Sequence, residues 1–488
     1  MRRLTPLALA VASFVLATGC QRENGTLQSA SKTLGASDLK SIEFSATGRW
    51  FQFGQAPAPD LAWPPFDVSR YTATIDYDHA GARVQITRKQ TVEAGRARPA
   101  AVEQKPDQYV SGGLAWNIAP PAGAPADAAP VAQTQPAAVE ERSAEIWSTP
   151  QGFLKAAAVN RASSKAINGG TEVSFTVGKE RYVGTINAHN EVERVQTWID
   201  NPVLGDTLIE TRYSDYKKFN GISFPAHIVR TEGGFPVLDL NVATVTPNAL
   251  VDIKVPDAVN ATPVPPITVT VETLAPGVLY LRGGTHHSVV IEQTDHIVVV
   301  EAPLNEARSE AVIAKVKETF PNKPIRYLIN THAHFDHSGG LRTYVDAGAT
   351  IVTEQANRAY YETVWAAPHS IAPDKLAQSK KASVFDTFTD KHVLSDGKRS
   401  IEIYRINGSG HNDAFALIYL PTEKILIEAD AYTPTAPGAP APTSINPYSV
   451  NLYDNIQRLK LDVDQIAAIH GPGVVKLTDL QAAIAPKS

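Results

Sequence analysis

Four side chains that can bind a metal ion stand within six positions of the sequence. They belong to the run Thr331 to Gly340 (THAHFDHSGG), and they are His332, His334, Asp336 and His337. In an extended chain, side chains two positions apart point the same way, so His332 and His334 can share one ion. Asp336 and His337 can then turn toward a second ion. This fixed pattern is far more specific for a metal than a lone pair of histidines.

The residues around this run indicate the elements that position it. The apolar residues Ile325 to Ile329 precede it, and a glycine pair and a helical pattern follow it. A buried strand is therefore expected to deliver the histidines to its carboxyl end, although a solvated polar loop is the alternative. Catalytic zinc is usually held by three protein ligands and a water, so two imidazoles are too few. Three further candidates follow strand-like runs: His411, Asp430 and His470.

These motifs, in this order, resemble those of the metallo-β-lactamase-fold hydrolase superfamily. The resemblance extends from about Pro266 to the end of the chain. It implies an α/β fold, an αββα sandwich, with two zinc ions per chain. Its implied ligands are His332, His334 and His411 for one ion, Asp336, His337 and His470 for the other, and Asp430 as a bridging carboxylate. True zinc β-lactamases usually carry Cys or Ser at that last place, so the chain looks more like the thioesterase, lactonase and esterase branches.

The activity that this resemblance implies is hydrolysis of a small ester, lactone or amide, in which a metal-bound hydroxide attacks the carbonyl. Asp336 is the expected catalytic residue, because beyond ligating it can orient the hydroxide and move its proton. Residues 431–457 contain no Lys or Arg to hold the carboxylate of a β-lactam. Only eighteen residues follow His470, so the helical extension of the glyoxalase II branch is not expected.

Three alternatives stay open at this point. The first is β-lactamase activity, and the second is a mononuclear iron enzyme of the persulfide dioxygenase type on the same fold. The third is a noncatalytic lipoprotein that binds apolar cargo through its amino-terminal sheet. Metal analysis separates the second from a two-zinc enzyme, and a broad hydrolysis panel tests the third.

For two other groups of residues, the sequence is compatible with either a role in the site or a role in packing. His286 and His287 follow Gly283 and Gly284, and either one contacts the substrate or both are ordinary packing residues. Several aromatic side chains could line the mouth of the site or be buried by a helix. They are Tyr360, Tyr361, Trp365, Phe385, Phe388, Tyr432, Tyr448 and Tyr453.

The residues before the metal-binding region predict a separate domain. Period-two alternation between turn residues indicates a mostly antiparallel β domain over residues 41–259, with a mobile Ala/Pro-rich loop over 118–140. Tyr213 to Pro225 resembles the strand-turn-strand of the half-barrel in periplasmic lipoprotein carriers, and a spacer role is expected. A proline-rich linker over 260–266 leads to the catalytic domain, 267–488. Because every candidate ligand lies beyond this linker, residues 266–488 are expected to act alone.

The first residues predict export. Arg2 and Arg3 precede an apolar stretch, Leu7 to Ala17, and residues 1–20 therefore read as a signal peptide that ends at Cys20. Cys20 is the only cysteine and stands where a bacterial lipobox places one, so its acylation would anchor the protein to the outer membrane, facing the periplasm. The alternative is an ordinary cleaved signal with an incidental cysteine. Residues 21–40 are expected to be an unstructured tether.

Composition limits the partners of the protein. The 488 residues are 43% hydrophobic and allow two domains, and the formal net charge is −5. With this acidic balance and no block of Lys or Arg, the sequence argues against a nucleic-acid partner. A small-molecule substrate is expected, with membrane contact only through the lipid anchor. The sequence leaves the oligomeric state open.

Overall fold

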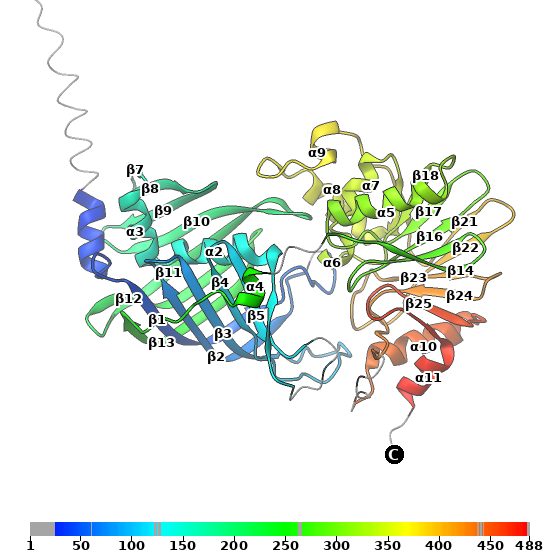
Figure 1. Ribbon diagram of the computed structural model, residues 1–488, viewed down its shortest axis with the longest axis horizontal. Coiled ribbons are helices and arrows are strands. Elements are labelled where there is room, and N and C mark those ends of the chain that lie inside the picture. Colours follow the sequence, from blue (N-terminus) through cyan, green and yellow to red (C-terminus); the bar gives the residue numbers. More distant parts are fainter. Residues whose placement is uncertain are drawn as a thin grey trace, which may run out of the picture.

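The computed structural model describes residues 25–59, 61–121, 124, 128–261, 266–436, 439, 442 and 444–485. The described chain forms a large amino-terminal antiparallel β domain and a carboxyl-terminal domain of two sheets with helices (Figure 1). Both parts of the predicted fold class are thereby confirmed. The predicted signal peptide with Cys20 and residues 262–265 of the predicted linker lie outside the described residues.

One thirteen-stranded sheet forms the first domain, with the strand order β6-β5-β4-β3-β2-β1-β13-β12-β11-β10-β9-β8-β7. Two runs of neighbouring antiparallel strands meet where β1 pairs with β13. The strands are β1 (Ser41–Phe51), β2 (Pro65–Asp76), β3 (Gly81–Gln90), β4 (Asp107–Ser111), β5 (Leu114–Ala119), β6 (Val131–Thr134), β7 (Ser163–Ile167), β8 (Gly170–Val177), β9 (Glu180–Asn187), β10 (Val192–Asn201), β11 (Gly205–Phe219), β12 (Ile222–Glu232) and β13 (Phe235–Pro247).

Helices cover one face of this sheet. They are α2 (Val139–Ser148) and α3 (Pro150–Val159), preceded by the short η1 (Pro136–Ala138), while α4 (Asp257–Asn260) ends the domain. Ile146 and Phe153 on these helices pack with alternate strand residues into one apolar core. Gly184 on β9 allows the close approach, because a Cβ there would lie 2.3 Å from Cζ of Phe153. Period-two alternation thus explains both the sheet and the face that it buries.

Two predictions for this domain are wrong in the described residues. Residues 25–34, within the predicted tether, form a helix whose Ala30 and Leu34 are fully buried in the core. Apolar residues four positions apart face one side of a helix, which gives this segment something to bury. Similarly, the predicted mobile loop over 118–140 contains β6 and η1, because its backbone can pair with β5.

The second domain contains two sheets. The first has seven strands in the order β14 (Thr270–Ala275), β15 (Val278–Arg282), β16 (Ser288–Glu292), β17 (Ile297–Val300), β18 (Ile325–Ile329), β19 (Thr350–Glu354) and β20 (Phe385–Phe388). The second has six strands in the order β21 (Lys391–Ser395), β22 (Ser400–Arg405), β23 (Ala416–Leu420), β24 (Ile425–Glu428), β25 (Gln465–Ala468) and β26 (Val474–Lys476).

Helices lie outside both sheets. Beside the first sheet are α5 (Glu306–Thr319), α6 (Phe335–Ser338), α7 (Leu341–Asp346), α8 (Gln355–Trp365) and α9 (Lys375–Ser379), and beside the second are α10 (Pro447–Leu459) and α11 (Leu477–Ile484) (Figure 1).

Alternation along the strands divides the core of the second domain into layers. On β17, Val298 and Val300 face the second sheet, whereas Ile297 and Val299 face the helices of the first. All four are fully buried, as expected for a strand with a layer on each side. The result is the predicted αββα sandwich. Among the described residues, no helix has the length and apolarity needed to cross a membrane.

Candidate metal centre

The candidate ligands lie on loops that follow strands of both sheets. The metal-binding run follows β18, His411 lies beyond β22, and Asp430 and His470 follow β24 and β25. β18 is parallel to both of its neighbours, and β24 is parallel to β25, so several strands in each sheet end at the same edge. The two sheets are tied together there by a bridge between His286 and His470. Loops at the carboxyl ends of strands are where open α/β sheets place their sites.

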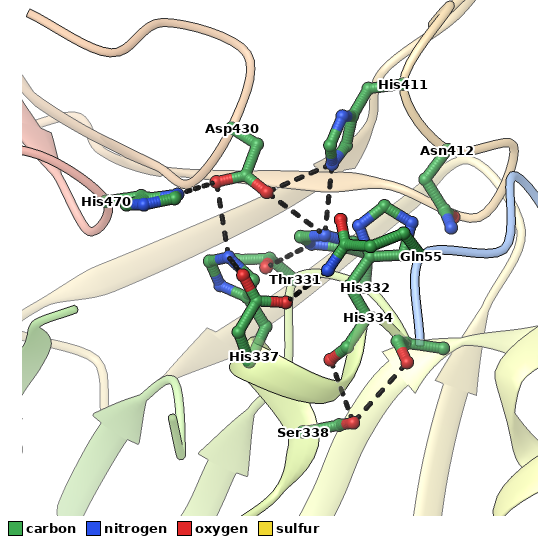
Figure 2. Close-up of polar contacts among 12 residues, drawn as sticks. Gln55, Thr331, His332, His334, His337, Ser338, His411, Asn412, Asp430 and His470 are labelled. Carbon is green, nitrogen blue, oxygen red and sulfur yellow. Dashed lines mark hydrogen bonds and ion pairs between the residues drawn. The ribbon is translucent and has the colours of Figure 1, made fainter. Parts of the chain in front are cut away.

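The structure brings all seven predicted site residues together, in two groups. One group contains His332, His334, His411 and Asp430, whose potential ligand atoms all lie within 4.8 Å of one another. Nε2 of His332 and Nε2 of His411 are 3.3 Å apart (Figure 2). His332 and His334 come from one extended segment and His411 from the other sheet. This donor set fits a metal ion.

The second group contains Asp336, His337 and His470 together with His286, again within 4.8 Å. Nε2 of His286 lies 3.2 Å from Oδ2 of Asp336, and its ring stacks on that of His470 with centroids 4.1 Å apart. Only 6% of His286 is exposed. Of the two histidines left open by the sequence, His286 therefore reaches the site. Nε2 of His287 instead donates to the carbonyl of Gly471 at 2.8 Å and so holds the loop that follows His470.

Asp430 lies between the two groups, and each of its carboxylate oxygens faces one of them. Oδ2 is 3.0 Å from Nε2 of His411 and 3.5 Å from Nε2 of His332. Oδ1 is 2.8 Å from Nδ1 of His470 and 3.2 Å from Nε2 of His337. Figure 2 shows this carboxylate reaching both sets of histidines. A carboxylate placed in this way can bridge two cations.

The protonation of the histidines suits metal binding in the first group. Burial, with the neighbouring His337, lowers the pKa of His332 to about 4. Burial also holds the pKa of His334 well below its usual range, and Nδ1 of His334 is buried without a hydrogen-bond partner. A neutral imidazole with a free nitrogen is the form that binds zinc. A buried nitrogen without a partner is costly, which is a reason to expect a ligand for it.

His337 and the two carboxylates beside it, Asp336 and Asp430, favour their charged forms. Burial by itself would raise the pKa of Asp336 and of Asp430, but His337 outweighs it and keeps both pKa values well below the usual range. Conversely, burial would lower the pKa of His337, but Asp430 and Asp336 raise it well above its usual range. Metal binding at His337 must therefore release a proton.

Glu301 is a further residue of the site that the sequence did not single out. It follows β17, is fully buried, and its Oε2 lies 3.0 Å from Nδ1 of His337. The hydroxyl of Thr331 donates to the same oxygen at 2.5 Å, and this hydroxyl also lies 3.0 Å from Nδ1 of His332. Glu301 thereby orients ligands of both groups. The sequence signal that could have identified Glu301 is an acidic residue directly after an otherwise apolar strand.

Most of the aromatic residues serve the core. Tyr361 is fully buried and stacks on Trp365 and Phe385, so α8 packs these rings inside the domain. Tyr448 differs, since its ring centroid lies 5.3 Å from that of His411. It is an aromatic side chain beside the candidate site.

Loops of the first domain reach the site, although every candidate ligand lies in the second domain. That residues 266–488 act alone therefore stays a prediction, and these contacts argue against it. The carbonyl of Ala56 lies 2.9 Å from Nε2 of His334, and the side-chain amide of Gln55 donates to Oδ1 of Asp336 at 2.8 Å. Arg96 forms a bidentate ion pair with Asp413, which lies two residues after His411. These contacts span the two domains, and spacing within the ligand motifs contains no information about them.

Comparison with known proteins supports the fold of the second domain. Residues 281–455 match the family model of the metallo-beta-lactamase superfamily. The carboxyl-terminal region of this chain is therefore a metallo-β-lactamase-fold domain, as the resemblance implied. No curated protein matches the chain.

Solved structures similar to the chain include a metallo-beta-lactamase from Pontibacter korlensis, 18% identical, with 44% of this chain and 97% of that one covered and a TM-score of 0.33. For the metallo-beta-lactamase FIM-1 from Pseudomonas aeruginosa in the mono-zinc form, the identity is 20%, the coverage 45% and 94%, and the TM-score 0.33. A flavodiiron protein from Giardia intestinalis has 16% identity, 45% and 59% coverage and a TM-score of 0.34. Each likeness covers less than half of this chain.

Proposed function

We propose that this protein is an exported zinc-dependent hydrolase that cleaves a small ester, lactone or amide. The observation that carries the proposal is the position of Asp430, whose two carboxylate oxygens face two separate groups of histidines. A site for two cations that share a carboxylate is suited to hydrolysis of a carbonyl compound. The signal-like residues 1–20 support export.

In this proposal His332, His334 and His411 hold one zinc ion, and Asp336, His337 and His470 hold the other, with Asp430 shared. Bound zinc would supply a water whose pKa falls toward about 7 and would polarise the substrate carbonyl. Nothing in this set requires a serine nucleophile. Burial favours the neutral forms of His332 and His334, and His337 is paired with Glu301 and Asp430.

Residues of the chain orient the reacting groups. Asp336 is fixed from two sides, because Gln55 donates to its Oδ1 and Nε2 of His286 lies 3.2 Å from its Oδ2. In that position Asp336 is suited to orient the attacking water toward the substrate carbonyl. The ring of Tyr448, beside His411, offers an apolar surface for the acyl part of the substrate.

Two arginine side chains near the site, Arg96 and Arg98, do not favour an anionic substrate such as a β-lactam. Arg96 is paired with Asp413, and Nη2 of Arg98 lies 3.1 Å from the carboxylate of Glu93. Both guanidinium groups are thus already neutralised by carboxylates of the protein. A neutral lactone, ester or amide is the substrate class that this environment suits.

A substrate panel tests the proposal. The full chain, stripped of metal and reloaded with zinc, is incubated with aryl esters, lactones, amides and β-lactams, and with glutathione persulfide after loading with Fe²⁺. We expect zinc-dependent hydrolysis of at least one uncharged ester or lactone, which a chelator abolishes and added zinc restores.

Other outcomes of this panel identify the alternatives. Hydrolysis confined to β-lactams would assign the chain to the lactamases. Oxygen consumption with the persulfide, together with one iron per chain, would indicate the iron enzyme. Failure of every substrate with fully zinc-loaded protein would overturn the hydrolase proposal and favour a noncatalytic role.

A further inference from the structure

We infer that the first domain is part of the metal centre. Residues 53–57, here called the bridging loop, leave the sheet of the first domain after β1 and lie against the metal-binding run of the second domain. Figure 2 shows Gln55 of this loop beside the candidate ligands. The loop supplies hydrogen-bond partners to two of the ligands. This inference rests on the proposed metal centre and gives the first domain a role other than that of a spacer.

The first contact fixes the orientation of His334. Nε2 of His334 donates to the carbonyl oxygen of Ala56 at 2.9 Å, which leaves Nδ1 for the ion. That nitrogen is the one that is buried without a partner. Asn412, which follows the ligand His411, donates its side-chain amide to the same carbonyl at 3.0 Å. The partner of the second ring nitrogen sets which nitrogen of a histidine binds the metal.

The second contact orients Asp336. The side-chain amide of Gln55 donates to Oδ1 at 2.8 Å, while Oδ2 points toward His286 and His337, at 3.2 and 3.8 Å. The hydrogen bond from Gln55 thus occupies the oxygen that faces away from the second group. It leaves Oδ2 oriented for an ion held with His337.

The bridging loop is itself held in place on both sides. The amide of Phe335 donates to the carbonyl of Gly54 at 3.1 Å, and the amide of Asp413 donates to the carbonyl of Pro57 at 2.8 Å. Gly54 has a φ of +73°, and a Cβ on it would lie 2.6 Å from Cγ of Phe335. Only glycine therefore allows this close approach.

These contacts couple metal binding to domain docking. The loop binds residues of the metal-binding run and residues beside His411, so it spans the two sheets from outside the second domain. When the loop moves, His334 loses its partner and Asp336 becomes free to rotate. Loss of such outer partners typically weakens metal binding by about 10- to 100-fold.

Zinc affinity of the full chain tests the inference without any substrate. Apo protein is titrated with Zn²⁺ against a chromogenic chelator, and with Co²⁺ to record the ligand-field bands. In Gly54→Ala the new methyl group pushes the bridging loop from Phe335, and we expect zinc binding to weaken by about 10- to 100-fold. In Gln55→Ala one hydrogen bond to Asp336 is lost, and a decrease of about tenfold is expected.

Each variant has a matched control. Gly113→Ala, in the turn between β4 and β5, introduces the same left-handed strain, since φ is +76°, but a Cβ there meets nothing within 4 Å. Gln52→Ala removes a glutamine from the same part of the chain, and the only hydrogen bonds described for Gln52 are made by its backbone. Both controls should bind zinc and cobalt like the wild type.

The outcomes separate this inference from the proposed function. Weaker zinc binding and altered cobalt bands in Gln55→Ala and Gly54→Ala, with unchanged controls, support the inference whether or not any substrate is hydrolysed. Wild-type zinc affinity in Gln55→Ala and in folded Gly54→Ala overturns it and leaves the hydrolase proposal intact. If Gly54→Ala does not fold, Gln55→Ala against Gln52→Ala decides. A wild-type chain that binds neither ion overturns both.

Discussion

Oε2 of Glu301 lies 3.0 Å from Nδ1 of His337, and both side chains are completely buried. Glu301 adopts a φ of +75°, a left-handed backbone conformation that is rare for a residue other than glycine. A conformation of this kind costs roughly 1 to 3 kcal/mol, and such strain gathers at functional sites. The strained turn after β17 therefore places a carboxylate directly behind a candidate ligand.

The first prediction concerns this pair. Glu301→Gln keeps the size of the side chain but removes the charge that holds the proton on Nδ1 of His337. We expect zinc to bind about 10- to 100-fold more weakly at the second position, as measured by chelator competition. Glu354→Gln is the control, because Glu354 is also buried but caps α8, and its described contacts include none of the candidate ligands. If Glu301→Gln bound zinc as tightly as Glu354→Gln and the wild type, a positioning role for Glu301 would be contradicted.

The second prediction concerns the shared carboxylate. Asp430→Asn removes one negative charge between the two groups, while His332, His334 and His411 can still hold one ion. Zinc content by elemental analysis should fall from about two ions per chain to about one, with kcat reduced far more than KM is raised. Asp462→Asn, on a side chain that is 72% exposed, should change neither. Two zinc ions and normal turnover in the Asp430 variant would show that this residue is no ligand.

The third prediction is a pH dependence of stability in the first domain. Glu141, Glu145 and Glu232 surround the guanidinium group of Arg230. Burial, and then the charge of Glu232, raises the pKa of Glu141 from 4.5 to about 7. Because the folded pKa lies above the unfolded one, the stabilisation is complete below pH 4.5 and is lost as the pH rises through about 7.

Glu141→Gln should remove this dependence. The side chain is 43% exposed, so solvent screening reduces the effect, and we expect the variant to gain about 1 kcal/mol over the wild type between about pH 5 and pH 8. Urea unfolding at each pH measures it. The exposed Glu103→Gln should follow the wild type, and parallel curves for all three proteins would refute the prediction.

The fourth prediction concerns export and anchoring. If Cys20 is acylated, labelled palmitate should enter the wild-type protein in a bacterial host and be absent from Cys20→Ala. The variant should also leave the membrane fraction, because Cys20 is the only cysteine of the chain. Equal labelling of both proteins would sink the idea of a lipid anchor.

Much of the fold was predictable because it depends on local patterns. Alternation with a period of two predicted the strands of the first domain, and apolar runs such as Ile325 to Ile329 predicted strands of the second. The prediction of an unstructured tether was wrong, because the helix over residues 25–34 is stabilised by burial against a sheet that follows it in sequence. A weak local pattern does not show against which part of the fold a segment will pack.

The sequence alone determined the ligand types, their spacing and the strands that deliver them, because these depend on residues a few positions apart. Only the tertiary structure decided that Asp430 faces both groups, that Glu301 supports His337, and that Gln55 reaches Asp336 across 281 positions. Those contacts depend on how strand ends and whole domains pack. Because many chains can share a local pattern and pack differently, their geometry cannot be inferred from spacing.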